Sequence, residues 1–259
     1  MPAFNEEQTL AGVLAVLKDT PAMQEILVVS DGSTDETVEI ALSLGLRTIH
    51  LRENRGKGTA LALGVAHSAA EILLFVDGDI VNLSREMIEE LIAPVLDGRS
   101  DMNVGVRNRG AWLNEMQRRN GPLLSGIRCL RRDIFAAVPS EHRRGFAIET
   151  ALNWACRELG CRLTTTVLYN LKHLVKEKKR GLARGAWARL IMFWSVFTTY
   201  QSLRWRRVGL APVASPAVSP GGPALPGGSS PLASPAASAP MSQLALASLL
   251  RPGLDYVDL

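Results

Sequence analysis

An apolar run that ends in two closely spaced acids constrains this chain most. Residues 71–81 read EILLFVDGDIV, so the apolar run Ile72 to Val76 leads directly into Asp77, Gly78 and Asp79. A short run rich in β-branched and aromatic residues predicts a strand buried on both faces, as in a parallel sheet. Ligands bind at the carboxyl ends of such strands, where these two acids lie. The sequence therefore predicts an α/β fold with an acidic site at one sheet edge.

The spacing of Asp77 and Asp79 suits a metal ion. Side chains alternate along an extended backbone, so residues two apart face the same way, and Gly78 between them lets a phosphate or metal approach the main chain. Two carboxylate donors favour Mg2+ or Mn2+, either of which can also bind diphosphate oxygens. A polar turn after a strand is the alternative that Asp-Gly-Asp alone leaves open.

Strand and helix patterns alternate from the start of the chain to Val81. We expect strands at 2–3, 25–30, 46–51 and 72–76, with helices over about 5–17, 34–44 and 59–68 between them. Asn5 is expected to cap the first helix, and Ser33 or Thr34 the second. This order predicts a Rossmann-like, mostly parallel sheet with helices on both faces.

Polar residues follow each of these strands, so we expect their side chains at one sheet edge. Asp31 follows the second strand, and the loop 54–58, Asn-Arg-Gly-Lys-Gly, follows the third and opens a helix. Backbone donors at a helix N-terminus, with a basic side chain such as Lys57, would attract a diphosphate, although many surface turns have the same pattern. The convergence of these clusters indicates a ligand site more strongly than any one of them.

The second half of the chain offers two further candidates. Segment 125–132, Ser-Gly-Ile-Arg-Cys-Leu-Arg-Arg, has three arginines that could clamp a phosphate or form a solvated basic turn. Glu149, at the start of a predicted helix, could act as a base or only stabilise the helix N-terminus. Around them we expect a helix capped by Ser84 and running to 96, strands at 102–107 and 162–167, and a helix at 133–138.

Positive charge is concentrated between Lys172 and Arg207, where ten lysines and arginines accompany one acid. Trp187, Trp194 and Trp205 alternate there with apolar residues, a composition typical of a helix at a membrane interface or of a core helix packed on the sheet. Nucleic acid is not expected as a partner, because the sequence indicates no sheet or groove on which bases could stack.

The three cysteines indicate a reducing compartment. Cys129, Cys156 and Cys161 have neither metal-type nor disulfide-framework spacing. The chain does not open with a signal-peptide pattern, and its most apolar stretch, 190–203, is shorter than the roughly 18 residues that span a bilayer. We therefore expect a cytoplasmic protein that binds peripherally at the inner face of the cell membrane.

Four motifs together resemble a known family. The nucleotide-sugar half of the family 2 glycosyltransferases is similar, in motif order and spacing, to PAFNEE at 2–7, VVSDGSTDET at 28–37, NRGKGTA at 54–60 and FVDGD at 75–79. The resemblance implies the GT-A fold and an aspartate-x-aspartate metal motif. Two further motifs resemble the acceptor half of the family, S-G-x-R at 125–128 and G-F-x-x-E-T at 145–150.

The resemblance also implies roles for individual residues. The nucleotide sugar would be bound by Pro2, Ala3, Glu6, Asp31, Lys57, Asp77 and Gly78. The metal, Mg2+ or Mn2+, would be held by Asp77, Asp79 and His173, because a histidine at this point closes over the nucleotide in many relatives. The catalytic residues would be Asp79 and Glu149, and the acceptor would contact Ser125, Gly126 and Arg128.

These expectations define an organisation and a function. We expect a GT-A domain at 1–180 (nucleotide-sugar half 1–107, acceptor half 108–180), an amphipathic basic and aromatic helix at 181–208, and a mostly disordered tail at 209–259. The expected reaction is metal-dependent transfer of a sugar from a nucleoside diphosphate to a polyprenyl phosphate at a membrane surface. The alternatives are a soluble transferase of the glucosyl-3-phosphoglycerate synthase type and a catalytically silent nucleotide-sugar binding module. The short first strand, and Ser30 where many relatives have an acid, motivate the last of these.

Overall fold

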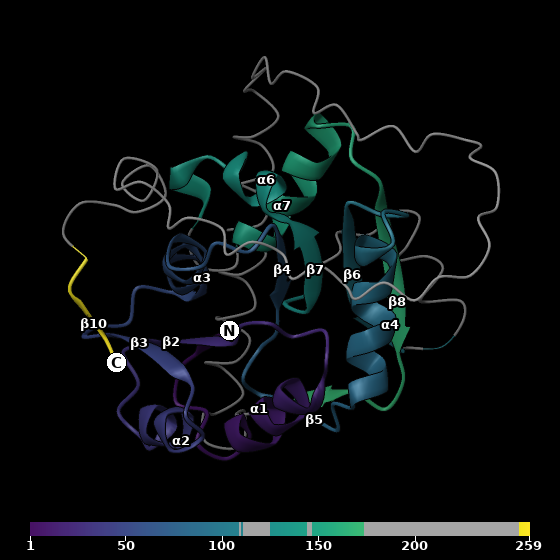
Figure 1. Ribbon diagram of the computed structural model, residues 1–259. Helices are drawn as coiled ribbons and strands as arrows, with labels where there is room; N and C mark the ends of the chain where they lie inside the picture. The colour runs from purple at the N-terminus through teal and green to yellow at the C-terminus, as the bar shows by residue number, and fades with distance from the viewer. Residues whose placement is uncertain (109, 111–124, 144–146, 174–253) are drawn as a thin grey trace, which may run out of the picture.

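The computed structural model describes residues 1–108, 110, 125–143, 147–173 and 254–259 (Figure 1). In this part of the chain the strands form two four-stranded sheets, ordered β1-β2-β3-β10 and β4-β7-β6-β8, and a two-stranded sheet of β5 and β9. The predicted helix at 181–208, and most of the tail expected at 209–259, lie outside the described residues. Among the described residues, no helix has the length and hydropathy needed to cross a bilayer.

The first sheet confirms the alternation predicted from the sequence. Strands β1, β2 and β3 are parallel, with Pro2 opposite Val29 and Leu27 opposite Arg47. The apolar runs predicted as strands form these strands. The helices between them bury one apolar face each, as α1 does with Leu10 and Leu14. The elements are β1 (Pro2–Ala3), α1 (Leu10–Asp19), β2 (Leu27–Asp31), α2 (Thr37–Ser43), β3 (Arg47–Leu51) and α3 (Lys57–Ala66).

The second sheet is mixed, so the prediction of a mostly parallel sheet is wrong in this half. Strand β7 lies between β4 and β6 and is antiparallel to both, and only β6 and β8 are parallel. The cause is the segment 125–132, which contains strand β7 where the sequence predicted a basic loop. The elements are β4 (Ile72–Phe75), β5 (Ile80–Val81), α4 (Arg85–Leu96), β6 (Met102–Arg107), β7 (Arg128–Arg131), α6 (Arg132–Ala136), η1 (Ser140–His142), α7 (Ala147–Glu158), β8 (Leu163–Leu168) and β9 (Lys172–His173).

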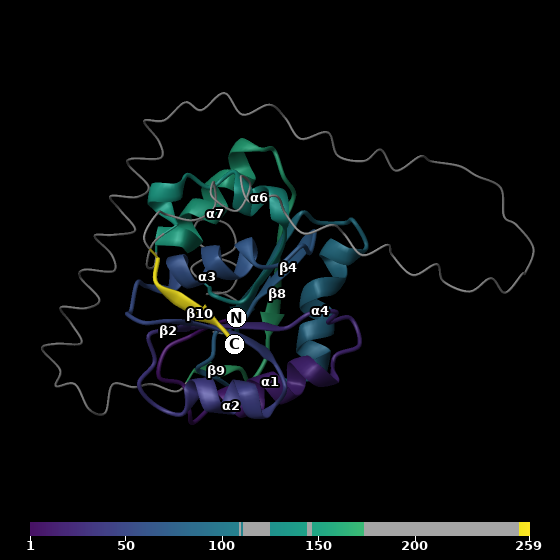
Figure 2. The same ribbon diagram turned by 60° about the vertical axis from the view of Figure 1, so that its left-hand side comes forward.

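Helices cover both faces of this second sheet, as the sequence predicted (Figures 1 and 2). One apolar cluster joins the sheet to α3, α6 and α7, and includes Leu61, Phe135 and Leu152. A second cluster joins the opposite face to α1 and α4, and includes Leu17 and Leu91. A strand that is covered on both faces needs apolar side chains on both, which is why β4 is a continuous apolar run in the sequence.

Two predicted helix caps are wrong, and one is confirmed. Helices α1 and α2 have Thr9 and Glu36 at their N-caps, later than Asn5 and Ser33 or Thr34. Asn5 instead has a φ of 55°, its Oδ1 accepts a hydrogen bond from the backbone N–H of Thr34 at 2.8 Å, and its own N–H donates to Ser33 Oγ at 3.1 Å. Ser84 does cap α4, by accepting from the Met87 N–H. The expected cap residues of the first two helices thus tie together the loops after β1 and β2.

A strand at the end of the chain was not predicted from the sequence. Strand β10 (Tyr256–Asp258) pairs antiparallel with β3, with Val257 opposite His50. Arg47 Nη2 lies 2.6 Å from Asp258 Oδ2. The last residues of the segment expected to be mostly disordered therefore extend the first sheet.

Candidate functional site

The side chain of Lys57 joins two carboxylates that are distant in the sequence. Its Nζ lies 2.7 Å from Asp77 Oδ1 and 2.9 Å from Glu149 Oε1. Lys57 begins α3, Asp77 follows β4, and Glu149 lies in the first turn of α7. We call these three residues the Lys57 cluster. Burial alone would lower the pKa of Lys57, but the charges of Asp77 and Glu149 raise it above its ordinary value, so Lys57 stays protonated.

Gly126 packs directly against the Lys57 cluster. A Cβ atom at this position would lie 1.9 Å from Asp77 Oδ2 and 2.3 Å from Lys57 Nζ, so only glycine allows this approach. The neighbouring Ser125 donates its hydroxyl to the carbonyl oxygen of Gly105 at 2.6 Å. The structure therefore brings predicted acceptor residues against predicted donor residues.

Arg128 lies beneath this site and is almost completely buried. Its Nη2 donates to the Ser125 carbonyl oxygen at 2.6 Å, and its Nη1 donates to Asn153 Oδ1 at 3.3 Å and to the Glu149 carbonyl oxygen at 3.4 Å. Burial lowers the pKa of its guanidinium below the ordinary value. Arg128 is 1% exposed, and its hydrogen bonds support the backbone at Ser125 and Glu149. Its predicted contact with an acceptor stays a prediction.

The other two arginines of segment 125–132 also stabilise the fold. Arg131 Nη2 lies 2.6 Å from Asp133 Oδ2. Arg132 Nη2 donates to the carbonyl oxygens of Val65 and Ser68, at 2.7 Å each, at the end of α3. Both guanidinium groups thus contact neighbouring parts of the fold. Phosphate binding by Arg131 and Arg132 stays a prediction.

Asp31 holds the loop that leads to Lys57. Its two carboxylate oxygens accept hydrogen bonds from the backbone N–H groups of Arg55, at 2.7 Å, and Gly56, at 2.8 Å. Burial raises the pKa of Asp31, while these two hydrogen bonds oppose the rise. Gly32 has a φ of 73°, and a Cβ there would lie 2.6 Å from the Asn54 nitrogen. Asp31 was predicted to face a nucleoside, but in this structure it faces the backbone of the glycine-rich loop.

The Asp-Gly-Asp segment is a turn. Strand β4 ends at Phe75, residues 78 and 79 form a turn, and β5 begins at Ile80, so the expected extended backbone from 77 to 79 is wrong. Thr9 Oγ1 donates to the Gly78 carbonyl oxygen at 2.6 Å and fixes this turn. The turn also packs on the first motif, because a Cβ at Gly78 would lie 3.0 Å from Glu6 Cγ and 3.6 Å from Ala3 Cβ.

Two residues of this site were missed by the sequence analysis. Thr9 was treated only as part of a helix, although it is buried and binds the turn at Gly78. Asn153 holds Arg128, and it lies four residues after Glu149 in α7. Residues four apart share a helix face, so the spacing of Glu149 and Asn153 was a signal that could have been used.

The residues predicted to bind a metal ion are Asp77, Asp79 and His173. Among the described residues, no group of three or more His, Cys, Asp or Glu side chains is arranged to hold a metal ion. The backbone of His173 lies opposite Ile80 in the β5–β9 pair, next to Asp79 in sequence, but the side chain of His173 lies outside what the structure describes. The carboxylates of Asp77 and Asp79 suit a hard divalent cation, and Lys57 already binds one Asp77 oxygen. The donor types fit Mg2+ or Mn2+, and metal binding by Asp77, Asp79 and His173 stays a prediction.

Comparison with known sequences gives a family match. A sequence model described as "Glycosyl transferase family 2" matches residues 1–138. The chain is 40% identical over 95 residues to a dolichyl-phosphate beta-glucosyltransferase of Drosophila melanogaster, covering 30% of this chain and 29% of that protein. It is 32% identical over 97 residues to a 4,4'-diaponeurosporenoate glycosyltransferase of Staphylococcus aureus, covering 36% of this chain and 26% of that protein. The matches thus span less than a third of the length of these relatives.

Solved structures resemble a larger part of the chain. Glucosyl-3-phosphoglycerate synthase from Mycobacterium tuberculosis, in complex with Mn2+, uridine-diphosphate and phosphoglyceric acid, has a TM-score of 0.64 and 25% sequence identity. This match covers 80% of this chain and 78% of the synthase. The same synthase with Mn2+, uridine-diphosphate-glucose and glycerol 3-phosphate also gives a TM-score of 0.64 at 25% identity, covering 78% and 77% of the two chains.

Proposed function

The chain belongs to glycosyl transferase family 2, and on that premise we propose that it transfers a sugar from a nucleoside diphosphate to a phosphorylated acceptor, with a polyprenyl phosphate as first choice. The observation that carries this proposal is the Lys57 cluster. The Asp77 carboxylate, after β4, and the Glu149 carboxylate, in the first turn of α7, both contact the ammonium group of Lys57. A donor-side group and an acceptor-side group are thus close enough to act on the same substrates.

We assign the donor side to the first motifs and the turn at Gly78. Ala3 and Glu6 pack near this turn, and Pro2 precedes Ala3 in β1, which supports contact of these residues with the nucleoside. Lys57 is a protonated side chain at a helix N-terminus, and it would bind diphosphate oxygens. Asp31 would act through the loop that it holds, as a positioning residue.

We assign the divalent ion to Asp79, with Asp77 and His173 completing the ligand set. A bound Mg2+ or Mn2+ would neutralise charge that develops on the departing diphosphate. Structures of a protein with the same fold contain Mn2+ together with uridine-diphosphate, which supports this choice of ion. Lys57 would hold Asp77 in place for this task, since the two side chains are in contact.

On the acceptor side, Glu149 and the segment at Ser125 would have different roles. The Ser125–Gly126 backbone would line the acceptor, supported from beneath by Arg128. A phosphate acceptor is largely ionised near neutral pH and attacks without a base. A hydroxyl acceptor must lose a proton, and Glu149 would accept it. Lys57 keeps the Glu149 carboxylate close to the donor side in both cases.

Two acceptor classes are supported by different observations. A polyprenyl phosphate is supported by the similarity to a dolichyl-phosphate beta-glucosyltransferase and by the basic, tryptophan-containing segment between Lys172 and Arg207, which would suit the inner face of a cell membrane. A small phosphorylated acceptor is supported by the structural similarity to glucosyl-3-phosphoglycerate synthase.

One transfer assay separates these possibilities. The full chain is incubated with radiolabelled UDP- and GDP-sugars and Mn2+, with a polyprenyl phosphate in detergent micelles in one arm and 3-phosphoglycerate in the other. We expect label in the lipid fraction, lost with EDTA and lost in Asp79→Asn. Label only in 3-phosphoglycerate would replace the lipid by the small acceptor. No transfer and no donor hydrolysis in either arm would contradict the proposal and favour a silent binding module.

A further inference from the structure

Strand β10 lies at one edge of the first sheet, beside β3 and close to α3 (Figures 1 and 2). Residues 254–259, which include this strand, are separated in the sequence from the rest of the described chain by residues 174–253. We call residues 254–259 the strap, because they contact both the loop that enters α3 and the end of this helix. The first residue of the same helix is Lys57, whose side chain joins Asp77 and Glu149.

Backbone hydrogen bonds attach the strap to β3. Leu259 exchanges two of them with Thr48, at 2.8 and 3.1 Å, and Val257 lies opposite His50. Hydrogen-bonded pairs alternate along antiparallel strands, so Val257 and His50 form the next bonded pair. The N–H of Val257 therefore belongs to the ladder, whereas its side chain is 40% exposed.

Alternate side chains of the strap face α3, as expected of an extended strand. Leu254 and Tyr256 pack on an apolar cluster that includes Leu63 of α3. The Tyr256 ring also lies edge-on to the ring of His67, the C-cap of this helix, and its hydroxyl lies 3.1 Å from His67 Nε2. The strap therefore covers the second half of α3.

Asp258 contacts the same end of α3 through Arg47. Its two carboxylate oxygens accept hydrogen bonds from Arg47 Nε at 3.2 Å and Nη2 at 2.6 Å. The remaining nitrogen of the guanidinium, Nη1, donates to the His67 carbonyl oxygen at 2.9 Å. A bidentate pair with a carboxylate fixes the plane of a guanidinium, so Asp258 orients the Arg47 donor that binds the end of the helix.

The loop that enters α3 is held by Asp255. The Arg52 N–H donates to the Asp255 carbonyl oxygen at 3.3 Å, and Arg52 Nη1 lies 3.0 Å from Asp255 Oδ2. Later in the same loop two backbone N–H groups donate to Asp31, just before α3 begins at Lys57. The loop is thus held from two sides, by Asp31 and by the strap.

We propose that the strap is a detachable element that sets the position of Lys57 for the binding of a donor diphosphate. When it pairs with β3, it fixes both ends of α3. When it leaves β3, the loop loses its contacts with Asp255, and the end of the helix loses those of Tyr256 and Asp258. The diphosphate in this inference rests on the proposed function, whereas the effect of the strap on the loop does not.

The contacts of the strap are weaker than those of other strands in the same sheet. All five residues of β2 are buried, whereas Tyr256 is half-buried and Val257 and Asp258 are exposed. The side chains of Arg52 and Asp255, which form an ion pair, are 66% and 61% exposed. Exposed ion pairs and half-buried side chains contribute little to stability. The strap can therefore separate from β3 while β1, β2 and β3 remain a sheet.

The experiment compares Val257→Pro with Val257→Thr in the full chain. Proline at this position removes the N–H that pairs with His50, whereas threonine keeps both the N–H and the β-branched shape. We expect Val257→Pro to speed amide exchange of Arg55 and Gly56 by about tenfold or more, and Val257→Thr to leave it near that of the parent chain. Exchange of Val104 in β6 should not change in either variant, because β6 belongs to the other sheet.

Nucleotide binding is the second readout. Calorimetry with UDP and GDP in the presence of Mn2+ should give a Kd about fivefold higher for Val257→Pro than for the parent, because binding must then order the loop. A strap that only stabilised the sheet would leave this Kd unchanged at temperatures well below Tm. Tyr256→Ala, which removes the packing on α3, should repeat both effects, and Tyr256→Phe, which keeps the packing, should show smaller ones.

Unchanged exchange of Arg55 and Gly56 in both Val257→Pro and Tyr256→Ala would overturn the proposal. Equally faster exchange of Val104 would also overturn it, because the strap would then stabilise the whole fold and not the loop. Faster exchange in the loop with an unchanged Kd would overturn it too, because Lys57 would then keep its position without the strap. Absence of nucleotide binding by the parent would contradict the proposed function, and the exchange rates alone would then decide whether the strap holds the loop.

Discussion

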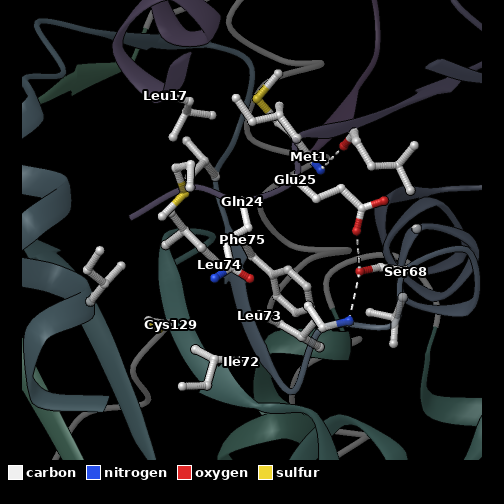
Figure 3. Close-up of a pocket in the computed structure, with 18 of the residues that line it drawn as sticks. Met1, Leu17, Gln24, Glu25, Ser68, Ile72, Leu73, Leu74, Phe75 and Cys129 are labelled. Atoms are coloured by element: carbon white, nitrogen blue, oxygen red, sulfur yellow. Dashed lines mark hydrogen bonds between the residues drawn. The ribbon is translucent and has the colours of Figure 1, made fainter. Parts of the chain in front are cut away.

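Strand β4 connects two regions that differ in packing and polarity. Beyond its carboxyl end, the Lys57 cluster is closely packed, and a single added Cβ at Gly126 would lie 1.9 Å from a carboxylate oxygen. Along the edge of β4 that does not face β7, a pocket of about 650 Å³ lies between mainly apolar side chains (Figure 3). The difference teaches that added atoms should be tolerated far less beside the Lys57 cluster than beside the pocket.

Gly126→Ala should have the largest effect, because the new methyl group cannot fit while Asp77 and Lys57 keep their contact. We expect sugar transfer to fall by about a thousandfold, since a displacement near 1 Å at a reacting centre already costs about a hundredfold. The matched control is Gly12→Ala in α1, where a Cβ meets no atom within 4 Å. If both variants keep parent activity, the close packing at Gly126 has no functional role.

Lys57→Met should destabilise the fold, because it leaves the carboxylates of Asp77 and Glu149 partly buried without their shared cation. We expect a loss of about 3 kcal/mol in the free energy of unfolding, measured in urea at pH 7.5. Lys18→Met is the control, because Lys18 is exposed and should change stability by less than about 0.5 kcal/mol. An equal loss of unfolding free energy in both variants would contradict the claim that Lys57 stabilises the fold through Asp77 and Glu149.

Acetylation of the Met1 amine should remove a pH dependence from stability. The amine has a folded pKa of about 5 against an ordinary value of 8.0, so between these values the unfolded chain binds a proton that the folded chain does not. Stability should therefore rise with pH across this window, by about 2 kcal/mol from pH 6 to pH 7.5. Urea unfolding of the parent and the Nα-acetylated chain checks this. Identical slopes would mean that the Met1 amine is not buried in the folded chain.

The first sheet, and the meeting of the polar motifs at one of its edges, could be predicted from the sequence. Both predictions rest on patterns of neighbouring residues. Strands β2 and β4 are short apolar runs that lead into acids, and β3 leads into the polar loop at 52–58. Side chains from these segments meet, as Lys57 and Asp77 do. The helix starts could not be predicted in this way. Asn5 and Thr34 resemble caps, but they bind each other across 29 positions, and no local pattern records such a contact.

Strands β7 and β10 were not predicted, for a related reason. Strand β7 begins and ends with arginines that suggest a solvated loop, yet Arg128 is buried because Asn153 and the Ser125 carbonyl oxygen accept its hydrogen bonds. Strand β10 has three residues, too few for a periodic pattern, and its partner β3 lies far away in the sequence. The buried Arg128 guanidinium and the backbone of β10 both need hydrogen-bond partners that are distant in the sequence, and only the fold brings these partners close.

The account depends most on the claim that Asp79 holds a divalent ion that binds the donor diphosphate. Calorimetric titration with UDP and GDP, with and without Mn2+, tests it without knowledge of the acceptor, using the parent chain, Asp79→Asn and the surface control Asp97→Asn. We predict that Mn2+ tightens nucleotide binding by at least about tenfold, or 1.4 kcal/mol, in the parent and in Asp97→Asn, and has no effect in Asp79→Asn. Full Mn2+ enhancement in Asp79→Asn would contradict the account.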